Sequence, residues 1–285
     1  MRPTRCGWGR ATGPDEKLWD RLSSLRHTSI YKGISVSQPQ KPTRLWEVDT
    51  LRGFAIVEMI FYHFVWDLNF FGLYDGNLLV GPWQWFARSI AIIFLFVMGV
   101  SLSLSYDSYQ QKRGQPAPFL KYLYRGLQVF GLGLLITIGT YFFVGPSFVV
   151  FGILHLLGAS IILGYPFLRF NKWVSLGAGL TMILTGLYLD TIFVSHAWLI
   201  WLGVKQIGRG MVDYYPLFPW AGFALLGIFA GRSLYHRGQL RFALPDLSQA
   251  SLGRGLRFLG RHSLLIYLVH QPLIIGMFMA LGYGR

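Results

Sequence analysis

Residues 126–168, GLQVFGLGLLITIGTYFFVGPSFVVFGILHLLGASIILGYPFL, decide the fold because these 43 positions contain no Asp, Glu, Lys or Arg. About twenty apolar residues are enough for one helix to cross a bilayer, and this stretch is twice as long. Gly145-Pro146-Ser147, near its middle, is a turn sequence. The stretch therefore predicts two transmembrane helices that fold back on each other at this turn.

The composition of the whole chain extends this interpretation. Of its 285 residues, 53% are hydrophobic and only 13% are charged, whereas soluble domains average about 25% charged residues. The 34 glycines and 13 prolines are scattered through apolar stretches, where transmembrane helices tolerate them. A single cysteine, Cys6, excludes a disulfide framework and a cysteine-based zinc site. We expect an all-α, polytopic integral membrane helical bundle.

Seven segments are apolar and long enough to span the membrane. The segment 191–204 is too short for a confident span, and we expect it to be interfacial or re-entrant. The predicted spans lie near residues 51–74, 83–105, 122–144, 147–167, 173–190, 214–231 and 263–282.

The basic residues predict the orientation. With a cytoplasmic amino terminus, 22 of the 26 Lys and Arg residues lie inside and 4 outside, and an eighth span at 191–204 would change this to 19 and 7. The positive-inside rule therefore favours seven spans in the plasma membrane. Residues 1–43 are predicted to be a basic, mostly disordered cytoplasmic arm, and 44–285 the membrane domain.

The first span carries titratable residues at bilayer depth, where a charge costs about 2.5–3.5 kcal/mol and so suggests a functional site. His63 follows Arg52 by eleven residues, which places it about 16 Å deeper along a helix. Asp67 is one turn further and shares a helix face with His63. A carboxylate that fixes the imidazole tautomer would make His63 a general base. Alternatively, His63 only bonds the backbone of another helix.

Four more polar residues lie in or beside spans. Glu58 is off the His63 stripe, and we expect it to bond another helix. His155 suits a structural hydrogen bond between helices. Asp213 heads the proline-containing start of the sixth span, near the outer surface, while His270 lies near mid-membrane, like His63. All four residues are candidates to line the acceptor site or a cavity.

The cytoplasmic arginines have two interpretations. Arg52, Arg125 and Arg261 either serve as topology determinants attracted to anionic lipid, or converge on the phosphates of a donor such as acyl-CoA. Asp49 and Arg52 are expected to form an ion pair at the helix start. The chain has no Walker loop, no GxGxxG, HExxH or GxSxG motif, and no metal-ligand spacing. ATP-driven pumping and a metal site are therefore not expected. Because the basic residues flank spans, neither is nucleic-acid binding.

Four motifs in order resemble the catalytic-domain family of heparan-α-glucosaminide N-acetyltransferase, in its short bacterial form. They are RLWEVDTLRGFAIVEMIFYHFVWDL (44–68), GILHLLG (152–158), DYYPLFPWAGFALLGIFAG (213–231) and GRHSLLIYLVHQPLI (260–274). The resemblance covers roughly residues 44–282. Related membrane acyltransferases that modify cell-surface glycans carry an Arg, ten residues and a His in their first span, which is the spacing of Arg52 and His63.

The resemblance implies transfer of an acyl group, typically acetyl, from cytoplasmic acyl-CoA to a glycan or amino-sugar acceptor outside. Acyl-CoA would be a co-substrate, and no permanently bound cofactor is implied. His63 would be the base or a transient acyl carrier, and Asp67 would orient it. Arg52 and Arg125 would contact the donor, and Asp213 would help to line the acceptor side.

This chain also departs from the family pattern. The animal enzyme has a histidine in the loop after its first span, whereas residues 72–85 here contain none. The chain has fewer spans, so its acceptor pocket is either reduced or completed by a second subunit of a homo-oligomer. A bacterial member has no reason to meet heparan sulfate, so that substrate is not inherited.

Two other function classes compete with the acyltransferase. The first is a small transporter or lipid-binding membrane protein in which the buried histidines and Asp67 form a proton relay. An inverted repeat would favour transport, and the sequence shows none. The second is an inactive scaffold that keeps the fold, because fold alone does not fix function.

Overall fold

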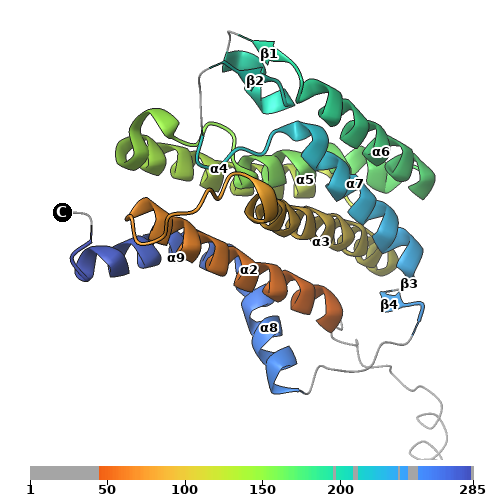
Figure 1. Ribbon diagram of the computed structural model, residues 1–285. Helices are drawn as coiled ribbons and strands as arrows, with labels where there is room; N and C mark the ends of the chain where they lie inside the picture. The colour runs from red at the N-terminus through yellow and green to blue at the C-terminus, as the bar shows by residue number, and fades with distance from the viewer. Residues whose placement is uncertain (1–44, 195–196, 208–210, 237, 243–249, 284–285) are drawn as a thin grey trace, which may run out of the picture. The chain divides into compact units, whose positions relative to one another are not determined.

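The computed structural model describes residues 45–194, 197–207, 211–236, 238–242 and 250–283. The predicted arm at 1–43 lies outside these residues. The predicted all-α bundle is confirmed (Figure 1). Its helices are α2 (Trp46–Phe70), α3 (Gly81–Arg113), α4 (Phe119–Val144), α5 (Ile153–Arg169), α6 (Lys172–Leu189), α7 (Leu217–Leu234), α8 (Ser251–Arg261) and α9 (Ser263–Ala280).

Five of the seven predicted spans are long and apolar enough to cross a membrane, namely α3, α4, α6, α7 and α9. Two differ from the expectation. Helix α5 has 17 residues, about 26 Å at 1.5 Å per residue, because the chain stays irregular after the turn at η1 (Gly145–Ser147) until Ile153. Helix α2 has ample length, 25 residues, but carries five Asp, Glu and Arg residues. The described chain is an integral membrane bundle.

The segment 191–204 does not form a spanning helix. It contains the short strand β1 (Phe193–Val194) and the 3-10 helix η2 (Ala197–Leu202). Strand β1 pairs in parallel with β2 (Lys205–Gln206). Another short pair, β3 (Tyr235–His236) with β4 (Gln239–Leu240), is antiparallel and follows α7.

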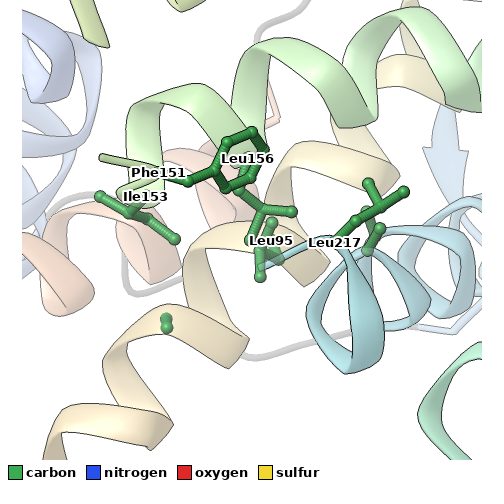
Figure 2. Packing of buried hydrophobic residues seen from close by; sticks show 8 residues of the cluster. Leu95, Phe151, Ile153, Leu156 and Leu217 are labelled. Atoms are coloured by element: carbon green, nitrogen blue, oxygen red, sulfur yellow. The ribbon is translucent and has the colours of Figure 1, made fainter. Parts of the chain in front are cut away.

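The apolar core lies where α3, α5 and α7 meet. Leu95, Leu156 and Leu217, one from each of these helices, belong to one buried cluster with Phe151 (Figure 2). Helix α4 packs on α5, and α6 packs on α7. Helix α2 contacts α3, α8 and α9, so it joins this core to the carboxyl-terminal helices.

Glycines let neighbouring helix backbones approach closely, as is usual where lipid supplies no hydrophobic force between helices. A Cβ on Gly227 of α7 would lie 2.1 Å from the carbonyl oxygen of Phe96 in α3. Likewise, a Cβ on Gly53 of α2 would lie 1.9 Å from the Leu256 carbonyl oxygen in α8. Small residues are thus required at both crossings.

Helix α8 was not expected from the sequence, because it lies between the predicted spans 214–231 and 263–282. Figure 1 shows α8 crossing the first half of α2. Its arginines, Arg254, Arg257 and Arg261, recur at helical spacing. A search for long apolar segments does not find a short, arginine-rich helix of this kind. It becomes apparent only in the tertiary structure, where it packs against α2.

Candidate active site

The rings of His63 in α2 and His270 in α9 meet edge to face, with their centroids 4.8 Å apart. The sequence places each histidine near mid-membrane but does not bring them together. The structure does so through the contact between α2 and α9. Two imidazoles at this separation can act on one bound group, because acid and base partners must lie within hydrogen-bond reach or one water of it.

Backbone contacts fix the tautomer of His63. Its Nδ1 lies 2.9 Å from the carbonyl oxygen of Met59. A carbonyl only accepts hydrogen bonds, so Nδ1 donates, and a neutral ring then carries its lone pair on Nε2. His63 therefore has the electronic form that a general base requires.

Asp67 does not orient His63, which corrects the expected pairing. Side chains on a helix tilt toward its amino terminus, so the His63 ring reaches back to Met59 rather than forward to the carboxylate. Asp67 Oδ1 instead accepts a hydrogen bond of 2.7 Å from Gln271 Nε2, which comes from α9. The two helices are thus linked beside the histidine pair.

Tyr267 was not identified from the sequence, and it connects His270 to a second polar group. Its ring centroid lies 5.7 Å from that of His270. Tyr267 is also close enough to Asp213 and Tyr215 to interact with both electrostatically. A tyrosine one turn before a buried histidine is a weak signal in so aromatic a sequence.

Asp213 caps a helix rather than joining the histidine pair. Its Oδ2 accepts a 3.1 Å hydrogen bond from the backbone N–H of Ile153, at the start of α5. A helix start favours a negative charge, yet burial raises the pKa of Asp213 to about 6, against the lowering effect of the Ile153 hydrogen bond. Asp213 lies four residues before the start of α7 and is bonded to the start of α5 rather than to either histidine of the pair.

His155 is buried near the same end of α5. Its Nδ1 accepts a 3.3 Å hydrogen bond from the N–H of Gly152, and its Nε2 lies 3.5 Å from the Thr137 hydroxyl of α4. Its ring packs against Phe130 and Phe151, which also line an apolar pocket of about 470 Å³. His155 occupies a different place from His63 and holds α4 and α5 together.

The hydrogen bond to another helix that was expected for Glu58 is not present. Its Oε2 is buried and has no hydrogen-bond partner in the part of the chain that the structure describes. The reason is its position on α2. Phe54 and Phe61, one turn before and after Glu58, are exposed, and the printed ring contacts of Phe61 are with Trp83 and Phe86 of α3. The side chains along this face are therefore mostly aromatic.

At the other end of α2, Asp49 lies between two arginines. The predicted ion pair is present, with Arg52 Nη1 3.3 Å from Asp49 Oδ1, and Arg261 Nε lies 3.4 Å from Asp49 Oδ2. Arg52 also donates to the Ser101 hydroxyl at 2.8 Å and to the Gly260 carbonyl at 3.5 Å. This network joins α2, α3 and α8 and holds the Arg52 guanidinium in place.

Two further cations lie on α4 beside this network. Arg125 is exposed and close enough to Arg52 and Lys121 for like charges to interact. Lys121, which the sequence analysis did not select, donates to Ser105 of α3 at 3.0 Å. Together, Arg52, Lys121, Arg125 and Arg261 form what we call the cationic cluster. Asp49 offsets one of these four positive charges, and the net positive charge that is left attracts phosphate groups.

The remaining sequence-selected residues thus divide into three places. Arg52 of the cationic cluster and His63 of the histidine pair both lie on α2, eleven residues apart. Asp213 and His155 both bond to the backbone at the start of α5. No group of three His, Cys, Asp or Glu side chains suited to a metal ion occurs among the described residues.

The family model for the catalytic part of heparan-alpha-glucosaminide N-acetyltransferase matches residues 44–272. The chain belongs to this family. The match begins just before α2 and ends just after Gln271, so it contains both the cationic cluster and the histidine pair. Neither a curated relative nor a solved structure matches the chain. Membership identifies the protein as a membrane acetyltransferase, and the predicted family is confirmed.

Proposed function

We propose that this protein transfers an acetyl group from cytoplasmic acetyl-CoA to the amine or hydroxyl of a sugar on the outer side of the plasma membrane. The observation that carries this proposal is the arrangement of α2. Near one end of the helix lies Arg52, the member of the cationic cluster that α2 contributes, and eleven residues further, about 16 Å along the axis, His63 meets His270.

The cationic cluster supplies the donor site in this proposal. Arg52 and Arg261 would bind the phosphates of acetyl-CoA, and Lys121 and Arg125 on α4 would add charge from the opposite side. The thioester sits at the end of the extended pantetheine arm, which would carry it from the cluster toward His63. The excess of Lys and Arg on the predicted cytoplasmic side supports this direction of entrance.

His63 supplies the base. Its Nε2 would take a proton from the acceptor as the acceptor nitrogen or oxygen attacks the thioester carbonyl carbon. The new N–C or O–C bond forms, the C–S bond breaks, and CoA leaves as the thiolate. Positioned general bases typically contribute about 10²- to 10⁴-fold to such steps.

The test uses purified protein in detergent with radiolabelled acetyl-CoA, measuring binding and CoA release. We expect Arg52→Ala to weaken saturable binding, and His63→Ala to abolish CoA release while binding persists. Lys172→Ala removes a charge from the start of α6, where Lys172 stacks on Trp173 rather than on a ring that a cluster residue contacts, and His262→Ala removes an exposed ring. Both are matched controls and should behave as wild type.

Failure of acetyl-CoA and of longer acyl-CoAs to bind at millimolar concentration would refute this proposal. The buried histidines and Asp67 would then be examined as a proton relay, using transport assays in proteoliposomes.

A further inference from the structure

Hydrogen-bond acceptors without donors gather where α2 and α9 meet. Gln271 Nε2 donates to one oxygen of Asp67 at 2.7 Å. The other oxygen of that carboxylate, Oδ2, is buried and has no partner among the described residues, and the same is true of Gln271 Oε1 and His270 Nε2. Asp67 is 2% exposed and His270 is 7% exposed. Buried polar atoms are rarely left unpaired in native proteins, because burial removes their hydrogen bonds to water.

The protonation of His270 follows from its backbone contacts. Its Nδ1 lies 2.7 Å from the carbonyl oxygen of Tyr267 and 3.2 Å from that of Ile266. Both carbonyls only accept, so Nδ1 carries the proton and a neutral ring has its lone pair on Nε2. The unpaired nitrogen is therefore an acceptor, like the two unpaired oxygens.

The hydrogen bond to Asp67 determines the orientation of the Gln271 amide. An ionised carboxylate only accepts hydrogen bonds, so the amide nitrogen must face Asp67 and the amide oxygen must point away. All three unpaired atoms are thus acceptors. An occupant that satisfies them must carry N–H or O–H hydrogens, which a thioester carbonyl does not have.

We propose that Gln271 is a positioning residue for the sugar acceptor, an inference that rests on the proposed function. By donating to Oδ1, Gln271 fixes the Asp67 carboxylate so that Oδ2 points at the acceptor group. Asp67 Oδ2, Gln271 Oε1 and His270 Nε2 then accept hydrogens from the sugar, both from the reacting amine or hydroxyl and from its neighbouring hydroxyls, while His63 takes the proton of the reacting group. The donor substrate is excluded from this subsite, because its reacting carbonyl would add a fourth acceptor.

The test measures acetyl transfer from acetyl-CoA to glucosamine as the acceptor probe. Gln271→Leu removes the hydrogen bond to the carboxylate, and hydrogen bonds to charged groups of this kind correspond to about a ten- to hundredfold change. We expect kcat/KM for glucosamine to fall by this factor while the KM for acetyl-CoA stays unchanged. Leu273→Ala, an exposed position on the same helix, is the matched control and should match wild type.

The pH dependence of the Gln271→Glu variant distinguishes a positioning role from a purely structural one, which would leave the pH profile of activity unchanged. A protonated glutamic acid can donate to Asp67, whereas an ionised one repels it. We therefore expect this variant to regain activity as pH is lowered, with its pH profile displaced to the acid side of wild type. Gln271→Leu should show no such recovery.

The outcomes separate the two proposals. If wild type transfers acetyl groups but Gln271→Leu leaves the glucosamine kcat/KM unchanged, or if both KM values rise equally, the positioning role is wrong and the proposed function stands. The same holds if Gln271→Glu and Gln271→Leu share one pH profile. If wild type neither binds acetyl-CoA nor releases CoA, the proposed function fails, and the positioning role fails with it.

Discussion

Replacing Gly260 by Ala should separate α8 from α2 and disturb the cationic cluster. A Cβ built on Gly260 lies 1.9 Å from the carbonyl oxygen of Asp49, and real Cβ atoms essentially never approach closer than 3.0 Å. The helices must therefore move apart by about 1.1 Å at this crossing, which overpacked interiors typically resist at a cost of about 1–3 kcal/mol. Gly255→Ala is the matched control, since a Cβ there meets nothing within 4 Å.

The control also removes a second effect from the comparison. Alanine is about 1 kcal/mol more favourable than glycine inside a helix, and this gain in helix propensity stabilises both variants equally. The difference in stability between Gly260→Ala and Gly255→Ala therefore isolates the overpacking. Thermal unfolding in detergent, followed by circular dichroism, should give a lower midpoint for Gly260→Ala.

The same displacement should weaken donor binding. The contacts of Arg261 with Asp49 and of Arg52 with the Gly260 carbonyl are already 3.4 and 3.5 Å long, so a shift of about 1 Å breaks both. We expect the Kd for acetyl-CoA to rise several-fold, corresponding to about 1 kcal/mol. Equal melting midpoints and equal Kd values for the two alanine variants would refute the close-approach reasoning.

Three further predictions concern single contacts. Ser101→Ala removes the hydroxyl that accepts from Arg52 at 2.8 Å and should lower the stability by about 1–3 kcal/mol, measured by thermal unfolding; an unchanged midpoint would contradict this. Lys121→Ala should weaken acetyl-CoA binding and reduce its salt dependence, measured by radioligand titration at several ionic strengths, whereas a parallel salt curve would place Lys121 outside the donor site. Because the folded protein raises the pKa of Asp213 to about 6, it binds more protons than the unfolded chain between about pH 4 and pH 6, and stability should fall as pH rises through this window. Asp213→Asn should remove that component of the melting-temperature profile, and identical slopes would show that Asp213 does not titrate there.

Local sequence patterns were sufficient for the helical architecture. The charge-free stretch 126–168 predicted α4 and α5, and the hydropathy of the remaining segments predicted five other helices near their observed positions. Hydrophobic length is a property of consecutive residues, so no contact between distant segments is needed to recognise it. The same search missed α8, whose eleven residues are stabilised against α2 rather than by length.

Side-chain partners were less predictable. The sequence correctly suggested an ion pair between Asp49 and Arg52, which are one turn apart. It wrongly suggested that Asp67, also one turn from His63, would bond to it, because spacing gives proximity without the direction of the ring. It also predicted a hydrogen-bond partner on another helix for Glu58, whose buried Oε2 has none among the described residues.

The sequence by itself determined that this protein is a membrane helical bundle of the N-acetyltransferase family, with costly polar residues at bilayer depth. Only the tertiary structure decided which of those residues act together. His63 and His270 are 207 positions apart, and their rings meet because α2 and α9 pack against each other. The free-energy cost of placing a polar side chain in the membrane depends on that residue alone. Its hydrogen-bond partners depend on which other helix packs beside it.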